Sequence, residues 1–283
     1  LIAISNSEES YRANKLFIGK MNKVLVQILK QEWPHNWPNF IGDICGASQT
    51  SEVLCENNMV ILRLLSEDVF DFSKDAMTTA KIRTLKESLN SEFAKIFQLC
   101  ELVLSSTTRA SLLNQTLATL QRFLTWIPLG YIFETQLLST LVLKFFTAPQ
   151  FRNAALDCLA EIASLTDLQP QYDPLFCELY VNFMQRLVEI VPEHVDIPQA
   201  YENGSETDKN FIQKLALFFT GYFKAHLKLL ETAEHAEALL SGLRYLVRIS
   251  MVPDNEVFQI ALESWHQFSQ ALYVSETQCV APA

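Results

Sequence analysis

The chain has 283 residues and a formal net charge of −10, and 49% of its residues are hydrophobic while 19% are charged. This composition is too apolar for a disordered chain and can supply a sizeable core. Because carboxylates repel phosphate backbones, the charge argues against nucleic-acid binding and favours basic protein partners. With only 7 glycines, a β-sandwich or barrel rich in tight turns is disfavoured.

The six cysteines show no short spacing typical of metal ligands, so we expect reduced thiols and no cofactor. Every apolar run is shorter than the ~20 residues that cross a bilayer, which predicts no membrane insertion. The opening residues LIAISNSEES lack Met and a basic region, so we expect no signal peptide and interpret the chain as part of a longer one.

Apolar residues recur at helical spacing from the first segment onward. There the stripe comprises Phe17, Met21, Val24, Leu25, Ile28 and Leu29. The stripes are broad, as is typical of helices buried on more than one side. Prolines fall between the periodic segments, and Asp254 after Pro253 is expected to cap a helix. The pattern predicts eleven helices, at residues 11–32, 37–46, 51–70, 79–105, 109–127, 134–147, 150–164, 174–191, 207–230, 235–251 and 254–273.

Alternate predicted helices begin near residues 11, 51, 109, 150, 207 and 254, which gives spacings of 40, 58, 41, 57 and 47 residues. HEAT and armadillo repeats run at ~40–47 residues, so three spacings fit and the longer two accommodate a longer helix or loop. We therefore predict an all-α fold, an α-solenoid of HEAT-type antiparallel helix pairs, with 1–283 forming a single array of about five and a half pairs. A closed irregular bundle is the alternative, disfavoured because single cores stop growing at ~250–300 residues.

The stretch QEWPHNWPNF at residues 31–40 contains two Trp-Pro pairs. Proline interrupts a helix, and the residue before it is pushed out of the helical region. We predict a packed corner in which one helix ends at Trp33-Pro34, Pro38 sits in the first turn of the next helix, and both tryptophans wedge between the two. This structural corner comprises Trp33, Pro34, Trp37, Pro38 and Phe40. A peptide-binding aromatic cluster is the alternative interpretation.

The segment FIGKMNKVLVQILKQEWPHNWPNFIGDI resembles the amino-terminal part of the importin-β, or karyopherin, superfamily. The blocks CENNMVILRLLSEDVFDFS and FLTWIPLGYIFET are similar to the chromosome-region-maintenance exportins, which carry leucine-rich nuclear export signals. The likeness runs from about residue 11 to 273 and is weaker over 166–253.

This resemblance implies an export receptor segment near the amino-terminal end of a HEAT-repeat ring, shuttling between nucleus and cytoplasm without enzymatic activity. Its implied partners are Ran-GTP, cargo with leucine-rich export signals, and nucleoporins, and the export-signal groove is expected beyond residue 283. By analogy, the helices at 37–46, 79–105, 134–147, 174–191 and 235–251 are the inner ones. A generic repeat scaffold of the phosphatase or vesicle-coat type is the alternative.

No catalytic or metal-binding motif is apparent, and the five histidines are scattered. His194 and Asp196 are expected in a polar, proline-bounded linker, and His226 near a helix end, where the dipole favours a histidine. We assign no catalytic, cofactor-binding or metal residue.

Carboxylates cluster in two stretches, Glu67, Asp68, Asp71 and Asp75, and then Glu189, Glu193, Asp196, Glu202, Glu206 and Asp208. Such clusters are either solvated loops or docking surfaces for a basic partner. On the expected inner helices, the candidate GTPase-facing residues are Asp43, Glu92 and Glu189.

Overall fold

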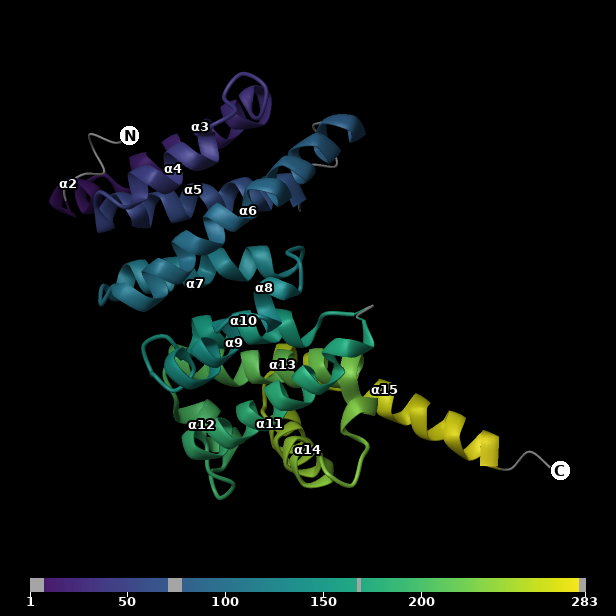
Figure 1. Ribbon diagram of the computed structural model, residues 1–283. Coiled ribbons are helices and arrows are strands. Elements are labelled where there is room, and N and C mark those ends of the chain that lie inside the picture. The colour runs from purple at the N-terminus through teal and green to yellow at the C-terminus, as the bar shows by residue number, and fades with distance from the viewer. Residues whose placement is uncertain (1–7, 71–77, 167–168, 280–283) are drawn as a thin grey trace. The chain divides into compact units, whose positions relative to one another are not determined.

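The computed structural model describes residues 8–70, 78–166 and 169–279, the stretch 274–279 by its backbone alone (Figure 1). Within these ranges every regular element is a helix, which confirms the all-α class. Contacts divide the chain into two compact units, Leu1–Tyr131 and Ile132–Ala283.

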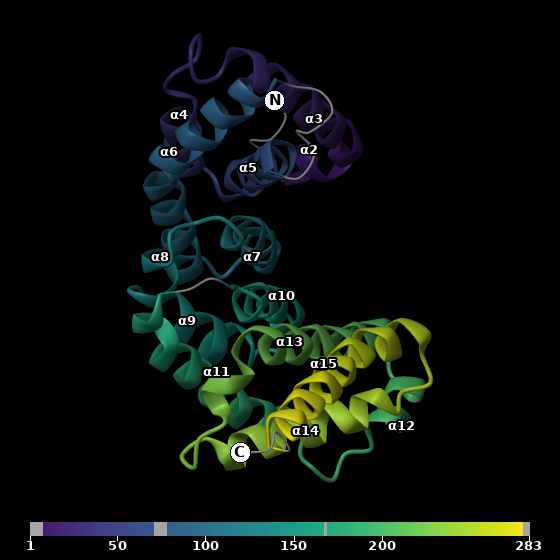
Figure 2. The same ribbon diagram turned by 90° about the vertical axis from the view of Figure 1, so that its right-hand side faces the viewer.

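The first unit consists of helices arranged in two rows. Its elements are α2 (Glu8–Ala13), α3 (Lys15–Glu32), α4 (Phe40–Ser48), α5 (Glu52–Phe70), α6 (Thr79–Ser106), α7 (Ala110–Leu124) and the beginning of α8 (Gly130–Phe133). In one row α5 packs between α3 and α7, and in the other α4 packs against α6 (Figure 2). This alternation is that of stacked helix pairs.

The core of the first unit is apolar, and its buried asparagine side chains are hydrogen-bonded. Asn22 of α3 donates from Nδ2 to Oδ1 of Asn57 on α5 at 2.8 Å. Near the end of the unit, Phe93 and Phe123 contact the ring of Trp126 edge-on, at centroid distances of 5.4 and 5.3 Å. The Trp126 indole donates to Ser66 Oγ at 3.1 Å, so this aromatic cluster joins the C-terminal parts of α5 and α7 to the middle of α6.

The second unit repeats the two-row arrangement. Its elements are α9 (Leu137–Ser139), the π-helix η1 (Thr140–Phe145), α10 (Arg152–Ala163), the 3-10 helix η2 (Pro170–Tyr172), α11 (Asp173–Ile190), α12 (Ile197–Asn203), α13 (Glu206–Leu230), α14 (Ala236–Ser250) and α15 (Asn255–Cys279). One row is α10, α13 and α15, and the other is η1, α11 and α14 (Figure 2). The predicted HEAT-type solenoid class is confirmed in the architecture of each unit.

Side-chain caps fix where the second unit's longest helices begin. Ser205 and Asp208 form a reciprocal capping box at the start of α13. Asp254 accepts hydrogen bonds from the backbone N–H groups of Glu256 and Val257 at 2.9 and 3.1 Å, which confirms it as the N-cap of α15.

Three local predictions were wrong. The helix after the Trp-Pro corner begins at Phe40, so Pro38 lies before it and not in its first turn. The helix expected at 134–147 is a short α9 continued by a π-helix. The linker expected around Asp196 contains α12, because Asp196 accepts a bond from the Gln199 N–H at 3.0 Å and caps a new helix. The single array over 1–283 stays a prediction.

Candidate functional site

The first tryptophan of the corner is buried. Trp33 ends α3 in an extended conformation, and its N–H donates to the Leu29 carbonyl at 2.8 Å. The side chain is only 2% exposed, and its indole Nε1 has no hydrogen-bond partner among the described residues. Phe40, at 3% exposure, is also buried. Trp33 is therefore buried, and its place between the two helices stays a prediction.

The second tryptophan lies on the surface, contrary to the prediction that both rings wedge between helices. Trp37 is 39% exposed. Its indole Nε1 donates to Asp43 Oδ2 at 3.1 Å, and its ring meets Phe40 edge-on at a centroid distance of 5.1 Å. Pro38 beside it is exposed, so this half of the corner is available to a partner.

The three candidate GTPase-facing carboxylates each have a local partner. Asp43 is exposed on α4 and accepts the Trp37 bond. On α6, Glu92 pairs with Lys95 at 2.6 Å. In the second unit, Glu189 is exposed near the end of α11 and takes two bonds at 2.8 Å from Arg186. Because α4 contacts α6, Asp43 and Glu92 belong to neighbouring helices of one row.

The first acidic cluster is neutralised where the structure describes it. Asp68 pairs with Lys30, which is 7% exposed, and Glu67 pairs with Arg122 at 3.1 Å. Asp71 and Asp75 lie outside the described residues. The described members therefore link helix ends within the first unit and leave little uncompensated charge.

The second acidic stretch also serves local structure. Glu193 lies 3.7 Å from Arg244, and Glu206 lies 3.5 Å from Lys209. Asp196 and Asp208 cap α12 and α13. Of the predicted cluster, only Glu202 has no such role among the contacts of the described residues. This arrangement favours the solvated, structural interpretation of the stretch.

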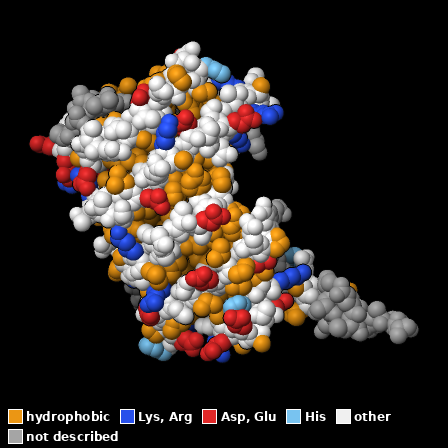
Figure 3. All heavy atoms as spheres, in the orientation of Figure 1, with side chains coloured by type: hydrophobic (Ala, Val, Ile, Leu, Met, Phe, Trp, Pro, Cys, Tyr) orange, Lys and Arg blue, Asp and Glu red, His pale blue; other side chains and the backbone are white. Residues whose placement is uncertain are grey.

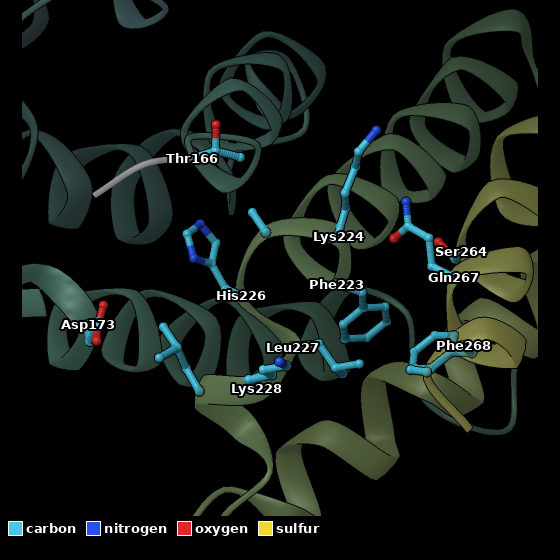
Figure 4. Close-up of a pocket in the computed structure, with 13 residues that line it drawn as sticks. Thr166, Asp173, Phe223, Lys224, His226, Leu227, Lys228, Ser264, Gln267 and Phe268 are labelled. Atoms are coloured by element: carbon cyan, nitrogen blue, oxygen red, sulfur yellow. The ribbon is translucent and has the colours of Figure 1, made fainter. Parts of the chain in front are cut away.

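A groove of about 580 Å³ lies between α13 and α15 in the second unit (Figure 4). Phe223 and Phe268 both line it, and their rings meet edge-on at a centroid distance of 5.7 Å. His226 turns toward the side of Thr166 and Asp173. The lining combines aromatic, aliphatic and charged side chains. Within the part of the chain that the structure describes, its His226 and Asp173 belong to no group of three side chains that could hold a metal ion.

His226 is a buried aromatic group of the core. It is 6% exposed and stacks on Phe176 at a centroid distance of 4.0 Å. Burial lowers the pKa of His226 from its usual value near 6.5 to about 4, against the opposing effects of the Asp173 charge and the Leu165 carbonyl. The expected position near a helix end is confirmed, since α13 ends at Leu230. The dipole does not explain the residue, because a neutral buried ring gains little from that field.

The five cysteines that the structure describes are free thiols. Burial raises the pKa of Cys45 and of Cys55 to about 11, and it raises the pKa of Cys100 further. Thiols held protonated in this way are weak nucleophiles.

Within the described ranges, His, Cys, Asp and Glu form no group of three or more that could hold a metal ion. No helix there is long and apolar enough to cross a bilayer. What the surface does offer is exposed apolar area: Figure 3 shows hydrophobic side chains gathered over parts of the face drawn, with charged ones scattered between them.

Comparison with known families decides what kind of repeat protein this is. A family model described as Exportin 1-like protein matches residues 14–159, just over half of the chain. The chain belongs to this exportin family. A second model, described as Chromosome region maintenance or exportin repeat, matches residues 237–273, which cover α14 and most of α15. The resemblance expected from the Trp-Pro corner and the WIPLGYIFET block is confirmed.

Full-length relatives align with nearly the whole chain. Protein EXPORTIN 1B of Arabidopsis thaliana is 49% identical over 100% of this chain and 26% of its own length. Exportin-1 of Schizosaccharomyces pombe is 47% identical over 96% of this chain and 25% of its own length, and that of Drosophila melanogaster is 47% identical over 98% and 26%. The chain therefore spans about a quarter of the length of these exportin relatives.

Solved structures show the same architecture at low identity. A designed armadillo repeat protein has a TM-score of 0.53 at 13% identity, covering 93% of this chain and 96% of that protein. A second engineered protein has a TM-score of 0.54 at 10% identity, with coverage of 93% and 94%. Such identities concern the fold alone, and they agree with an α-solenoid of helix pairs.

Proposed function

We propose that this exportin chain is part of a nuclear export receptor that binds Ran-GTP and supports export of proteins carrying leucine-rich nuclear export signals. The observation that carries the proposal is the alignment of nearly the whole chain, at 47–49% identity, with proteins named exportin 1 in a plant, a yeast and an insect. The receptor shuttles between nucleus and cytoplasm and contacts nucleoporins. The groove for the export signal lies outside residues 1–283.

The chain acts by binding and catalyses no reaction. Its helix pairs are joined by packing and by ion pairs, and among the described residues no three His, Cys, Asp or Glu side chains form a group that could hold a metal ion. Membership of the exportin family also favours the transport receptor over a phosphatase or vesicle-coat scaffold, since neither of those classes is named among the relatives reported above.

The GTPase contacts lie, in this proposal, on α4 and α6 in the first unit and on α11 in the second. Asp43 and Glu189 are exposed, and Glu92 is partly exposed with its side chain 29% accessible. Their local partners are surface ion pairs or a single indole bond, which a basic partner can replace at a cost of ~0–1 kcal/mol each. These carboxylates therefore suit a basic surface better than the buried ones do.

The test is the affinity of the longer receptor for GTP-loaded Ran, measured by titration with GDP-loaded Ran as the negative control. Reversing the charge at Asp43, Glu92 and Glu189 together is expected to lower the affinity for GTP-loaded Ran. It is also expected to make that affinity less sensitive to salt concentration. A matched variant reverses three exposed carboxylates off these helices, Glu9, Glu202 and Glu256. Equal affinity of both variants and the parent would remove these three residues from the interface, and no Ran-GTP binding by the parent would refute the receptor proposal.

A further inference from the structure

The two Trp-Pro pairs of the corner differ in a way that gives them different roles. Trp33 is 2% exposed and fills the space at the end of α3, whereas Trp37 is 39% exposed only four residues later. A ring of this size contributes most when it is buried, so the surface position of Trp37 is not explained by packing of the core. Its surroundings indicate what it is placed to contact.

We propose that Trp37 and Asp43 form a cradle for an arginine side chain presented by a docking protein. The indole face provides a cation–π surface, and the Asp43 carboxylate beside it provides the opposite charge. The inference deepens the proposed function, because Asp43 is one of its candidate GTPase-facing residues, and it rests on that function for the identity of the partner.

The cradle is held in place before any partner arrives. The hydrogen bond of 3.1 Å from the Trp37 indole to Asp43 Oδ2 joins the ring to the first turn of α4. The ring also contacts the buried Phe40 edge-on, with an interplanar angle of 72°. A surface ring fixed by two contacts loses little conformational entropy on binding, and this favours affinity.

Charge complementarity selects a cation. The bond from Trp37 leaves most of the acceptor capacity of the Asp43 carboxylate available, since a carboxylate can accept about four hydrogen bonds. The neighbouring Lys95 on α6 is already paired with Glu92 at 2.6 Å, so it competes little for Asp43. The chain as a whole carries a charge of −10, which steers basic surfaces toward it.

Geometry selects arginine over lysine. A guanidinium is planar, stacks on an indole and pairs with a carboxylate through parallel N–H bonds, whereas an ammonium is a strongly hydrated point charge. The surface of α4 next to Asp43 is also bare. A Cβ added at Gly46 would meet no atom within 4 Å, and one at Gly42 would meet only Lys95 Nζ at 4.0 Å. A partner segment can therefore lie along α4 while its arginine reaches the cradle.

The test uses the 283-residue chain and three capped tripeptides, Gly-Arg-Gly, Gly-Lys-Gly and Gly-citrulline-Gly. Citrulline has the shape of arginine without its charge. The four tryptophan indole N–H signals are followed by NMR, and the Trp37 signal is assigned by its loss in Trp37→Phe. The arginine peptide is expected to shift the Trp37 signal at lower concentration than the lysine peptide, and the citrulline peptide is expected to leave it unchanged.

Two variants separate the parts of the cradle. Asp43→Asn keeps an oxygen for the indole bond and removes the charge, and it is expected to weaken arginine-peptide binding about tenfold. Trp37→Leu keeps an apolar side chain but removes the aromatic ring, and it is also expected to weaken binding of the arginine peptide. Calorimetry measures the affinity of each variant for the peptide. The control Glu87→Gln removes one exposed charge from α6, where Glu87 pairs with Arg83 at 2.7 Å, and should leave affinity unchanged. The cradle would be refuted if the citrulline peptide shifted the Trp37 signal as much as the arginine peptide does. It would also be refuted if Glu87→Gln weakened arginine-peptide binding as much as Asp43→Asn does.

The same variants in the longer receptor distinguish the two proposals. If Asp43→Asn weakens peptide binding but not Ran-GTP binding, the cradle stands and the GTPase is not its partner. If charge reversal weakens Ran-GTP binding while the tripeptides never shift Trp37, the GTPase surface stands and the cradle is refuted.

Discussion

The corner offers a sharp stability test, because it contains two tryptophans of the same motif in opposite environments. Replacing Trp33 with alanine removes a ring that is 2% exposed and leaves a cavity at the end of α3. Changes of this type cost ~3–5 kcal/mol. Trp37→Ala removes a ring that is 39% exposed, and we expect it to cost about 1 kcal/mol.

A third variant uses the unpaired indole of Trp33. A buried donor without a partner costs ~1–3 kcal/mol, and Nε1 of Trp33 has none among the described residues. Trp33→Phe removes that donor together with part of the apolar area, so the two effects oppose each other. We expect Trp33→Phe to change stability by less than about 1.5 kcal/mol.

The assay must resolve the first unit, because a chain of two units need not unfold in a single step. Urea denaturation followed by far-UV circular dichroism gives the midpoints, and hydrogen exchange of peptides from α3 and α4 reports the corner directly. Trp33→Ala should speed exchange there and Trp37→Ala should not. Equal destabilisation by both alanine variants would refute the assignment of wedge and surface roles.

Three further outcomes follow from buried groups. The pKa of His226 is about 4 in the folded chain and near 6.5 when unfolded, so the unfolded state binds more protons between these values. The free energy of unfolding should fall as pH drops from 6.5 to 4, by up to roughly 3 kcal/mol, and urea titrations of His226→Phe should lack this slope. Arg109 donates at 3.1 Å to Glu56, which is 8% exposed. Arg109→Met should therefore lower the free energy of unfolding by about 3 kcal/mol, because it leaves a buried charge unpaired. Adding Glu56→Gln in a double-mutant cycle should restore part of that stability. Iodoacetamide should modify Cys177 before Cys45, as mass spectrometry can show, because Cys177 is partly exposed while burial raises the pKa of Cys45 to about 11.

Helix positions were largely predictable from the sequence because the apolar stripes are long and prolines separate them. The segments at 51–70 and 79–105 match α5 and α6 within a residue at either end. Short elements were not predictable. A residue such as Asp196 reads equally well as a linker carboxylate or as a cap, and only the hydrogen bond to the Gln199 N–H decides between them.

Which face of a helix is buried was harder to predict than where the helix lies. The predicted stripe of α3 correctly includes Leu29, which is fully buried, but it also includes Phe17 and Val24, which are both 51% exposed. The buried face instead contains Ile18, Val26 and Asn22, whose amide pairs with Asn57 at 2.8 Å. Hydrophobicity alone did not predict this face, because it contains the polar residue Asn22. A buried amide is tolerated only when it has a hydrogen-bond partner, and the partner of Asn22 lies 35 residues away in the sequence.

The sequence predicted which acidic residues could form the candidate site, but it did not predict the role of each one. That role depends on the hydrogen bonds and ion pairs that each carboxylate makes within the chain. Glu56 is buried beneath Arg109 and Ser111, so releasing it would leave an uncompensated charge in the core. Glu92 and Glu189 are held only by neighbours on their own helices, Lys95 and Arg186. Such short-range surface pairs contribute ~0–1 kcal/mol and exchange readily with an incoming cation.

Asp43 differs from these, because its partner is a neutral indole N–H and its charge is uncompensated by any ion pair within the described residues. An arriving arginine would gain the carboxylate without displacing another cation, and would gain the ring face as well. The carboxylates of this chain can therefore be ranked by what a partner must displace, with Asp43 first, Glu92 and Glu189 next, and Glu56 excluded. The order of affinity losses in the corresponding single amide variants of the longer receptor should follow the same ranking.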